Sequence, residues 1–99
     1  MTQIPVDEIG YDKKYYPRVN GKEDWMTVYR YSETLIADEE KEFPPIAVVR
    51  AIRKPYKFLV LDGLHRLRAY YRAERKKIPT DVESWPQSKW FERSVELNV

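Results

Sequence analysis

The sequence contains no cysteine and only one histidine, His65. Without cysteine, the chain cannot form a disulfide, a thiolate nucleophile or a cysteine-based zinc site. A single histidine also argues against the multi-histidine sites that hold catalytic zinc. We therefore assign no metal ligands from the sequence.

Long apolar runs and amide side chains are scarce as well. No apolar segment approaches the roughly 18 residues that a membrane-spanning helix needs. The opening residues MTQIPVDEIG lack the basic and apolar regions of a signal peptide. We therefore expect a cytoplasmic protein with no membrane partner. Four Asn and Gln stand against 34 Lys, Arg, Asp and Glu, a balance reported for proteins from hot environments, so the composition favours thermostability.

The length and the hydrophobic pattern predict a single α+β domain over residues 1–99. The composition, 42% hydrophobic and 34% charged, is that of a globular domain with a modest core. Segments rich in β-branched residues predict strands. Helices are predicted where apolar residues recur every three or four positions and Gly and Pro are absent. Strands are expected at 4–9, 46–52, 56–61 and 78–83, and helices at 22–40 and 63–75.

This order of elements indicates a small mixed β-sheet packed with helices. A short turn separates 46–52 from 56–61, so these two strands are expected to form a hairpin. Pro79 predicts an edge or strand-start position for its strand, because proline cannot donate a ladder hydrogen bond. The tail from residue 84 onward is ambiguous, and Pro86 could be the first residue of a short helix.

Charge is unevenly distributed along the chain, although the net charge is only +2. Residues 50–77 hold ten Lys or Arg and two acids, whereas the other residues hold eight basic and fourteen acidic side chains. A solvated basic helix face would explain this block. Attraction of phosphate, from a nucleotide or a nucleic-acid backbone, is the alternative that we favour. The residues predicted to contact a nucleic-acid backbone are Arg72, Arg75, Lys76 and Lys77.

The basic block includes an unusual turn, LDGLHR, where a predicted strand passes into a predicted helix. Gly63 allows a sharp turn or the close approach of a ligand. The first N–H groups of the helix have no partner within it, and with the positive end of the helix dipole they form an anion site. The planar fork of Arg66 suits phosphate oxygens. The predicted phosphate-binding residues of this turn are Gly63, Leu64, His65, Arg66 and Arg68.

Other interpretations of the turn stay open. Asp62 could be only the N-cap of the helix. Arg66 and Arg68 could pair with the acidic residues at 38–42. The turn could also be catalytic, with Asp62 as a base or metal ligand, His65 as a general acid or base, and Arg66 stabilising phosphate charge.

The segment LDGLHRLRAYYRAERKKIPTDV resembles the most characteristic segment of the ParB/sulfiredoxin superfamily. That segment is a strand, a Gly-x-x-Arg-x-x-Ala turn and helix, and then an Ile-Pro strand. Some members read Asp-Gly-x-His-Arg at the turn, as this chain does. ParB N-terminal domains read roughly Gly-Glu-Arg-Arg-x-Arg-Ala, and here Leu64 and His65 replace the Glu and the first Arg. The residues that match this ParB pattern are Gly63, Arg66, Arg68 and Ala69.

The likeness extends upstream. IPVDEIGYDKKYYPRV is similar to the opening strand of ParB and its Pro-Arg loop, here Pro17-Arg18. FPPIAVVRAIRKPYKFLVLDG is similar to the strand and hairpin that precede the turn. The resemblance covers about residues 4–83 and leaves 84–99 as a C-terminal extension. It implies a ParB/sulfiredoxin-like fold that binds a nucleoside triphosphate, CTP or ATP, with Mg²⁺. It also implies that Arg18 joins the turn in binding the phosphates, and that the domain works on or along DNA.

Three departures narrow this expectation. Leu64 occupies the position of the catalytic cysteine of sulfiredoxins, so sulfiredoxin activity is excluded. The final sixteen residues have no room for the helix-turn-helix domain of chromosome-partition ParB proteins, so operator binding by that route is not expected. Free-serine kinases of the superfamily share a comparable turn but are considerably longer, which disfavours phosphorylation of serine.

The favoured function is therefore a ParB-like nucleotide-binding domain with a role in partition, regulation or DNA processing. A metal-dependent nuclease or phosphotransferase that uses the same turn is the first alternative, so enzymatic activity stays undecided. The second is sequence-independent DNA binding through the basic helix. Bases could stack on Tyr11, Tyr15 and Tyr16, but packing on the surface or at a partner is the interpretation that we favour for these tyrosines. Eight tyrosines and three tryptophans also leave room for a homo-oligomer interface.

Overall fold

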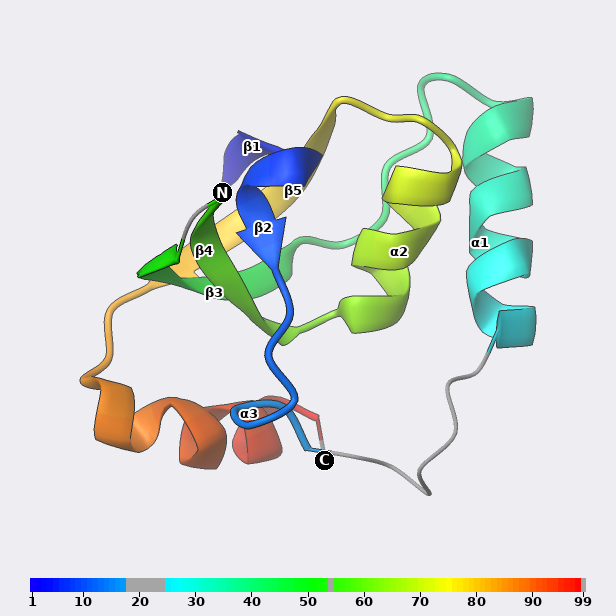
Figure 1. Cartoon of the computed structure of the whole chain (residues 1–99). Helices are drawn as coiled ribbons and strands as arrows, with labels where there is room; N and C mark the ends of the chain where they lie inside the picture. The colour runs from blue at the N-terminus through cyan, green and yellow to red at the C-terminus, as the bar shows by residue number, and fades with distance from the viewer. Residues whose placement is uncertain (18–24, 54, 99) are drawn as a thin grey trace.

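The computed structural model describes residues 1–17, 25–53 and 55–98. Over these residues it shows one five-stranded mixed sheet with three α-helices (Figure 1), so the predicted α+β class is confirmed. The strands are β1 (Thr2–Pro5), β2 (Ile9–Gly10), β3 (Ile46–Arg53), β4 (Tyr56–Asp62) and β5 (Lys77–Glu83). The helices are α1 (Trp25–Ala37), α2 (Leu64–Arg72) and α3 (Trp90–Leu97).

The sheet has the strand order β1-β5-β3-β4-β2. β3 and β4 pair antiparallel, as the predicted hairpin requires. β5 runs parallel to β3, and α2 forms the connection between β4 and β5. The central strands are apolar on both faces because helices cover both sides of the sheet. The candidate turn at Asp62–Leu64 therefore lies at the end of a central, buried strand.

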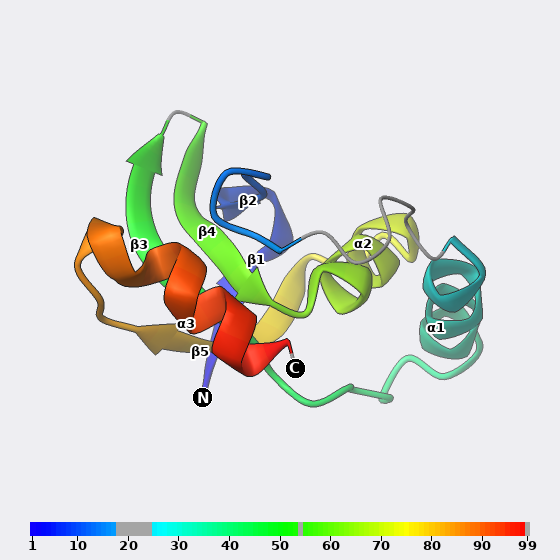
Figure 2. The ribbon, with the colours of Figure 1, turned by 90° about the horizontal axis from the view of Figure 1, so that it is seen from below.

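Two hydrophobic cores lie on opposite faces of this sheet. Val48 and Val60 point into the first core, beneath α2, and α1 packs against α2. Val49 and Leu61 point into the second core, which Trp90 of α3 covers. Because side chains alternate along a strand, neighbouring valines of β3 serve different cores. Figure 2 shows α3 lying across the sheet, away from the α1–α2 pair.

The first predicted strand, 4–9, is wrong as a single element. The chain forms β1 beside β5 at one edge of the sheet and β2 beside β4 at the other. A 3₁₀ turn over Val6–Glu8 connects the two short strands. Ile4, Val6 and Ile9 still share one core, so their apolar spacing carries no sign of the crossing from one edge to the other.

Of the two positions predicted for the Pro79 strand, edge or strand start, the edge position is wrong. β5 lies between β1 and β3, so it has neighbours on both sides. The pairing of β5 with β3 begins at Thr80, opposite Ile46. Pro79 therefore precedes the ladder on the β3 side, where its missing N–H costs no hydrogen bond in that pairing.

The C-terminal tail packs onto the sheet as a helix. Pro86 precedes a 3₁₀ turn over Gln87–Lys89, and α3 follows. The Ser94 hydroxyl donates a hydrogen bond of 2.6 Å to the carbonyl oxygen of Leu61, which ties α3 to the end of β4. None of the helices in the described part of the chain is long and apolar enough to cross a membrane.

A bidentate ion pair joins α3 to the end of β5. Arg93 Nε and Nη2 lie 2.8 and 3.2 Å from the two carboxylate oxygens of Glu83, and the Trp85 indole donates to the same carboxylate. The Arg93 hydrogen bonds, with a smaller contribution from Trp85, lower the pKa of Glu83 against the opposing effect of partial burial. This pair should make the attachment of α3 sensitive to acid.

We expect Glu83→Gln to destabilise the protein at pH 7, and to destabilise it less in acid. A lowered folded pKa contributes stability above the unfolded glutamate pKa of about 4.3, and this contribution is lost as pH falls through the folded pKa. Urea unfolding at pH 7 and at about pH 3 measures the difference between the variant and the wild type. Glu92→Gln, in an exposed pair with Lys89, is the control. An equal destabilisation by Glu83→Gln at both pH values would contradict the prediction.

Candidate functional site

The predicted strand-to-helix turn is present in the structure. β4 ends at Asp62, α2 begins at Leu64, and Gly63 between them is the N-cap, with φ 98° and ψ 30°. A Cβ atom on Gly63 would lie 2.4 Å from Ile46 Cγ2 and 3.0 Å from Arg66 Nη2. Both the left-handed backbone and the surrounding space therefore require glycine here.

Arg66 folds back over this turn. Its Nη1 donates to the carbonyl oxygens of Pro44, at 3.0 Å, and Pro45, at 3.1 Å. Its Nη2 lies 3.2 Å from Asp62 Oδ2. Asp62 is thus an ion-pair partner rather than the N-cap, and Arg66 pairs with Asp62 rather than with the acidic residues at 38–42. These contacts keep a positive charge at the amino end of α2 and hold the turn against the chain that enters β3.

Tyr16 is part of the turn, although the sequence motif does not include it. The N–H of Leu64 donates to Tyr16 Oη at 3.3 Å, and the Tyr16 hydroxyl donates to Asn98 Oδ1 at 3.0 Å. Burial raises the pKa of the Tyr16 phenol, and the Leu64 N–H opposes that rise. Instead of forming an exposed stacking surface, Tyr15 is buried and Tyr16 partly buried. The adjacent Pro17-Arg18 match was the only sequence signal near Tyr16.

Arg68 lies on the flank of α2 that faces a groove of about 1070 Å³. Two positions along a helix correspond to about 200° of rotation, so Arg66 and Arg68 lie on different flanks of α2. The Arg68 guanidinium carbon lies 5.5 Å from the Tyr11 ring centroid and 5.6 Å from that of Trp25. The groove is lined, among others, by Tyr11, Trp25, Tyr56, Leu64, Arg68 and Tyr71.

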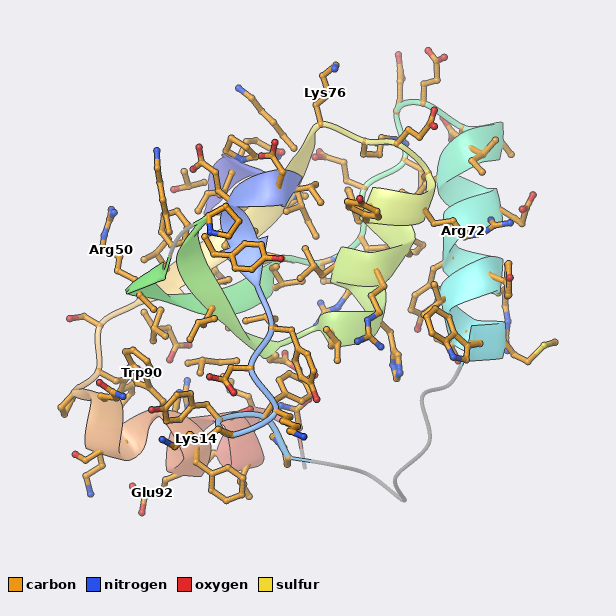
Figure 3. The ribbon with its side chains drawn as sticks, viewed as in Figure 1. Lys14, Arg50, Arg72, Lys76, Trp90 and Glu92 are labelled. Atoms are coloured by element: carbon orange, nitrogen blue, oxygen red, sulfur yellow. The ribbon has the colours of Figure 1, made fainter. Side chains whose placement is uncertain are left out.

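The four predicted nucleic-acid contacts divide into two pairs. Arg72 Nη1 donates to Ser32 Oγ at 2.7 Å and to Glu33 at 3.0 Å, so it faces α1, as Figure 3 shows. Arg75 also contacts the carboxyl end of α1, where its Nη2 donates to the carbonyl oxygens of Leu35 and Asp38. Lys76 and Lys77 are exposed, and Lys76 projects outward from the loop between α2 and β5 in Figure 3.

Arg18, which was predicted to bind phosphate, lies outside the described residues. Within residues 1–17, 25–53 and 55–98, no group of three or more His, Asp or Glu side chains could hold a metal ion. His65 is partly exposed in the first turn of α2, next to Arg66. The structure thus brings Asp62, Gly63 and Arg66 together, and it adds Tyr16 to them.

Comparison with known proteins gives matches among solved structures only. No family model and no curated protein sequence matches the chain. The C-terminally truncated chromosome-partitioning protein ParB from Caulobacter crescentus, complexed with CTP-γ-S, is 19% identical over 99% of this chain and 52% of that chain, with a TM-score of 0.77. The same protein complexed with the centromeric parS site is 18% identical over 99% and 46%, with a TM-score of 0.75. Sulfiredoxin from Arabidopsis thaliana is 13% identical over 93% of both chains, with a TM-score of 0.65.

The chain therefore has the ParB/sulfiredoxin fold. The likeness of its LDGLHR segment to that superfamily predicted this fold. It is similar both to the N-terminal part of ParB and to sulfiredoxin, and it lacks the cysteine of the latter. It spans about half the length of the ParB structures that it matches.

Proposed function

We propose that the turn from Asp62 to Arg68 binds the phosphates of a nucleotide, and that the domain acts together with DNA in partition, regulation or DNA processing. The observation that carries the proposal is the glycine turn at the amino end of α2, with Arg66 held across it. The similar ParB structure was solved with CTP-γ-S, which supports the same class of ligand.

The chemistry of the turn suits a phosphate. The first N–H groups of α2 point along the positive end of the helix dipole, where a phosphate oxygen is a favourable acceptor. Arg66 and His65 supply side-chain donors in the same helical turn. A nucleoside triphosphate, CTP or ATP, would bring Mg²⁺ on its own phosphates, which is how proteins without a complete metal site usually hold this ion.

DNA association rests on separate observations. Lys76 and Lys77 are exposed beyond the end of α2, and a ParB structure of similar fold was solved with the parS site. Contacts from lysines to a phosphate backbone do not require sequence readout, and they weaken steeply with salt. The nuclease or phosphotransferase alternative keeps Asp62 and His65 as its predicted catalytic residues, and no observation on the described residues favours it over binding.

Calorimetric titration with CTP, ATP and ADP in the presence of Mg²⁺ tests the nucleotide site. We expect wild-type protein to bind at least one triphosphate, and Arg66→Lys to weaken binding about tenfold or more, because charge-assisted hydrogen bonds contribute about 1.5–3 kcal/mol and lysine lacks the arginine fork. Lys89 is exposed in the 3₁₀ turn before α3, where it pairs with Glu92, so Lys89→Ala should bind normally. Absence of heat with every nucleotide would overturn the proposal.

A further inference from the structure

The hydroxyl of Tyr16 lies where the proposed phosphate would bind. Its oxygen accepts the N–H of Leu64, the first residue of α2. We propose that Tyr16 gates the site: a phosphate bound at the amino end of α2 displaces the Tyr16 hydroxyl from the Leu64 N–H, and the displacement is transmitted through Asn98 to α3. This inference rests on the proposed function and adds a regulation of the same turn.

The contact between Tyr16 and Leu64 can be displaced. Its donor–acceptor distance is 3.3 Å, beyond the usual range of about 2.7–3.2 Å for an N–H donor and an oxygen. A phosphate oxygen carries charge, and charge-assisted hydrogen bonds are roughly twice as strong as neutral ones. One N–H cannot serve both acceptors with good geometry, so the hydroxyl and the phosphate exclude each other.

Tyr16 competes as a neutral acceptor. Burial raises the pKa of its phenol, so the hydroxyl keeps its proton near neutral pH. That proton is donated to Asn98 Oδ1 at 3.0 Å. The Leu64 N–H therefore faces an uncharged oxygen in the absence of a ligand. Exchange of this neutral acceptor for an anion is therefore favourable. The hydrogen bond to Asn98 also ties the Tyr16 hydroxyl to the C-terminal end of α3.

Asn98 connects Tyr16 to α3 and to β4. Its Nδ2 donates to the carbonyl oxygen of Leu61 at 2.9 Å and to that of Ser94 at 2.7 Å. Leu61 directly precedes the Asp62-Gly63 turn. The turn, Tyr16 and the carboxyl end of α3 thus belong to one hydrogen-bond network. Displacement of Tyr16 removes the acceptor role of Asn98 in this network and loosens the last turn of α3.

The preceding residue offers a matched control. Tyr15 packs edge-to-face on Trp90 of α3, with ring centroids 5.1 Å apart, and its hydroxyl accepts a hydrogen bond from Gln87. Tyr15→Phe therefore removes a hydroxyl from the same segment on the α3 side, without touching the Leu64 N–H. Tyr16→Phe keeps the ring and removes only the competing oxygen.

We expect Tyr16→Phe to bind CTP–Mg²⁺ or ATP–Mg²⁺ about 2- to 10-fold more tightly than wild type, because removing the competitor saves one neutral hydrogen bond. Inorganic tripolyphosphate should show the same gain, because the effect concerns phosphate only. Tyr15→Phe should bind like wild type. Calorimetric titrations measure the affinities, and thermal melting verifies that both variants are folded.

Amide hydrogen exchange tests the link to α3. In wild type, ligand should speed exchange at Asn98, whose N–H donates to the Ser94 and Val95 carbonyl oxygens. In Tyr16→Phe this exchange should be fast already and respond little to ligand. If ligands bind but Tyr16→Phe binds equally or more weakly, or if exchange at Asn98 does not change, the gate is wrong and the phosphate site stands. If neither protein binds any phosphate compound, both proposals are wrong.

Discussion

Replacing Gly63 by alanine should lower the free energy of unfolding by about 2–5 kcal/mol and remove phosphate binding at the turn. The backbone of Gly63 has φ 98°, and a left-handed conformation costs a residue with a Cβ about 1–2 kcal/mol. The new Cβ would lie 2.4 Å from Ile46 Cγ2, and overpacking of this kind costs about 1–3 kcal/mol. In a domain whose total stability is about 5–15 kcal/mol, urea unfolding will resolve this loss.

A double-mutant cycle separates the two causes. Ile46→Ala alone should cost about 2–5 kcal/mol by leaving a cavity. Combined with Gly63→Ala, it removes the overlapping methyl, so the double variant should lose less than the sum of the two single variants. Strict additivity would show that the overlap with the Ile46 Cγ2 methyl contributes nothing. Wild-type stability of Gly63→Ala would contradict the whole argument.

Gly63 shows how much of the site could be predicted from the sequence. A glycine between an apolar run and a helical pattern is visible without a structure, and so are Asp62 and Arg66 beside it. The partners of Arg66 are not visible, because Pro44 and Pro45 approach it only when β3 pairs with β4. The long-range folding of the chain, rather than any local pattern, sets these contacts.

Tyr16 was missed as a member of the turn for a similar reason. It lies 48 positions before Leu64 in the chain and meets that residue only in the folded state. One of its other partners, Asn98, belongs to the tail whose structure the sequence left ambiguous. An aromatic side chain in a loop is compatible with stacking, packing or hydrogen bonding, and only its neighbours decide between them.

The end of α2 is a local feature that the sequence pattern did not predict. The pattern predicted a helix as far as residue 75, but α2 ends at Arg72. Glu74 adopts φ 59°, and the chain closes with hydrogen bonds from Arg75 N–H to Tyr70 and from Glu74 N–H to Tyr71. This is a Schellman ending, which glycine normally marks. Because Glu74 takes the position instead, no glycine marks the end of the helix in the sequence.

For the basic block, residues 50–77, the sequence could not predict which basic side chains face solvent and which face the rest of the protein. Arg75 Nη2 donates to the carbonyl oxygens of Leu35 at 3.0 Å and Asp38 at 2.9 Å, at the carboxyl end of α1. A cation there satisfies helix-terminal carbonyl groups and complements the helix dipole. Arg72 contacts Ser32 and Glu33 in the same helix. Two of the basic residues, Arg72 and Arg75, thus hold α2 and its C-terminal end against α1. A count of charges along the sequence does not distinguish them from the exposed lysines.

We therefore expect Arg75→Ala to lower the free energy of unfolding by about 1–3 kcal/mol, because it leaves helix-terminal carbonyl groups without their donor. Lys76→Ala and Lys77→Ala, at exposed positions, should stay within about 0.5 kcal/mol of wild type. Urea unfolding followed by tryptophan fluorescence measures these differences. An Arg75→Ala variant as stable as the lysine variants would show that the contact with α1 contributes little.

The same variants separate packing from DNA contact. If DNA binds through Lys76 and Lys77, each alanine should reduce the slope of log affinity against log salt concentration by about 0.9, because one fewer phosphate is neutralised. Arg75→Ala should leave that slope unchanged under conditions where the variant is folded. Fluorescence anisotropy with duplex DNA at several salt concentrations measures the slopes. An equal decrease for Arg75→Ala would place this residue on the DNA despite its bonds to α1, whereas unchanged slopes for both lysine variants would remove them from the DNA-binding surface.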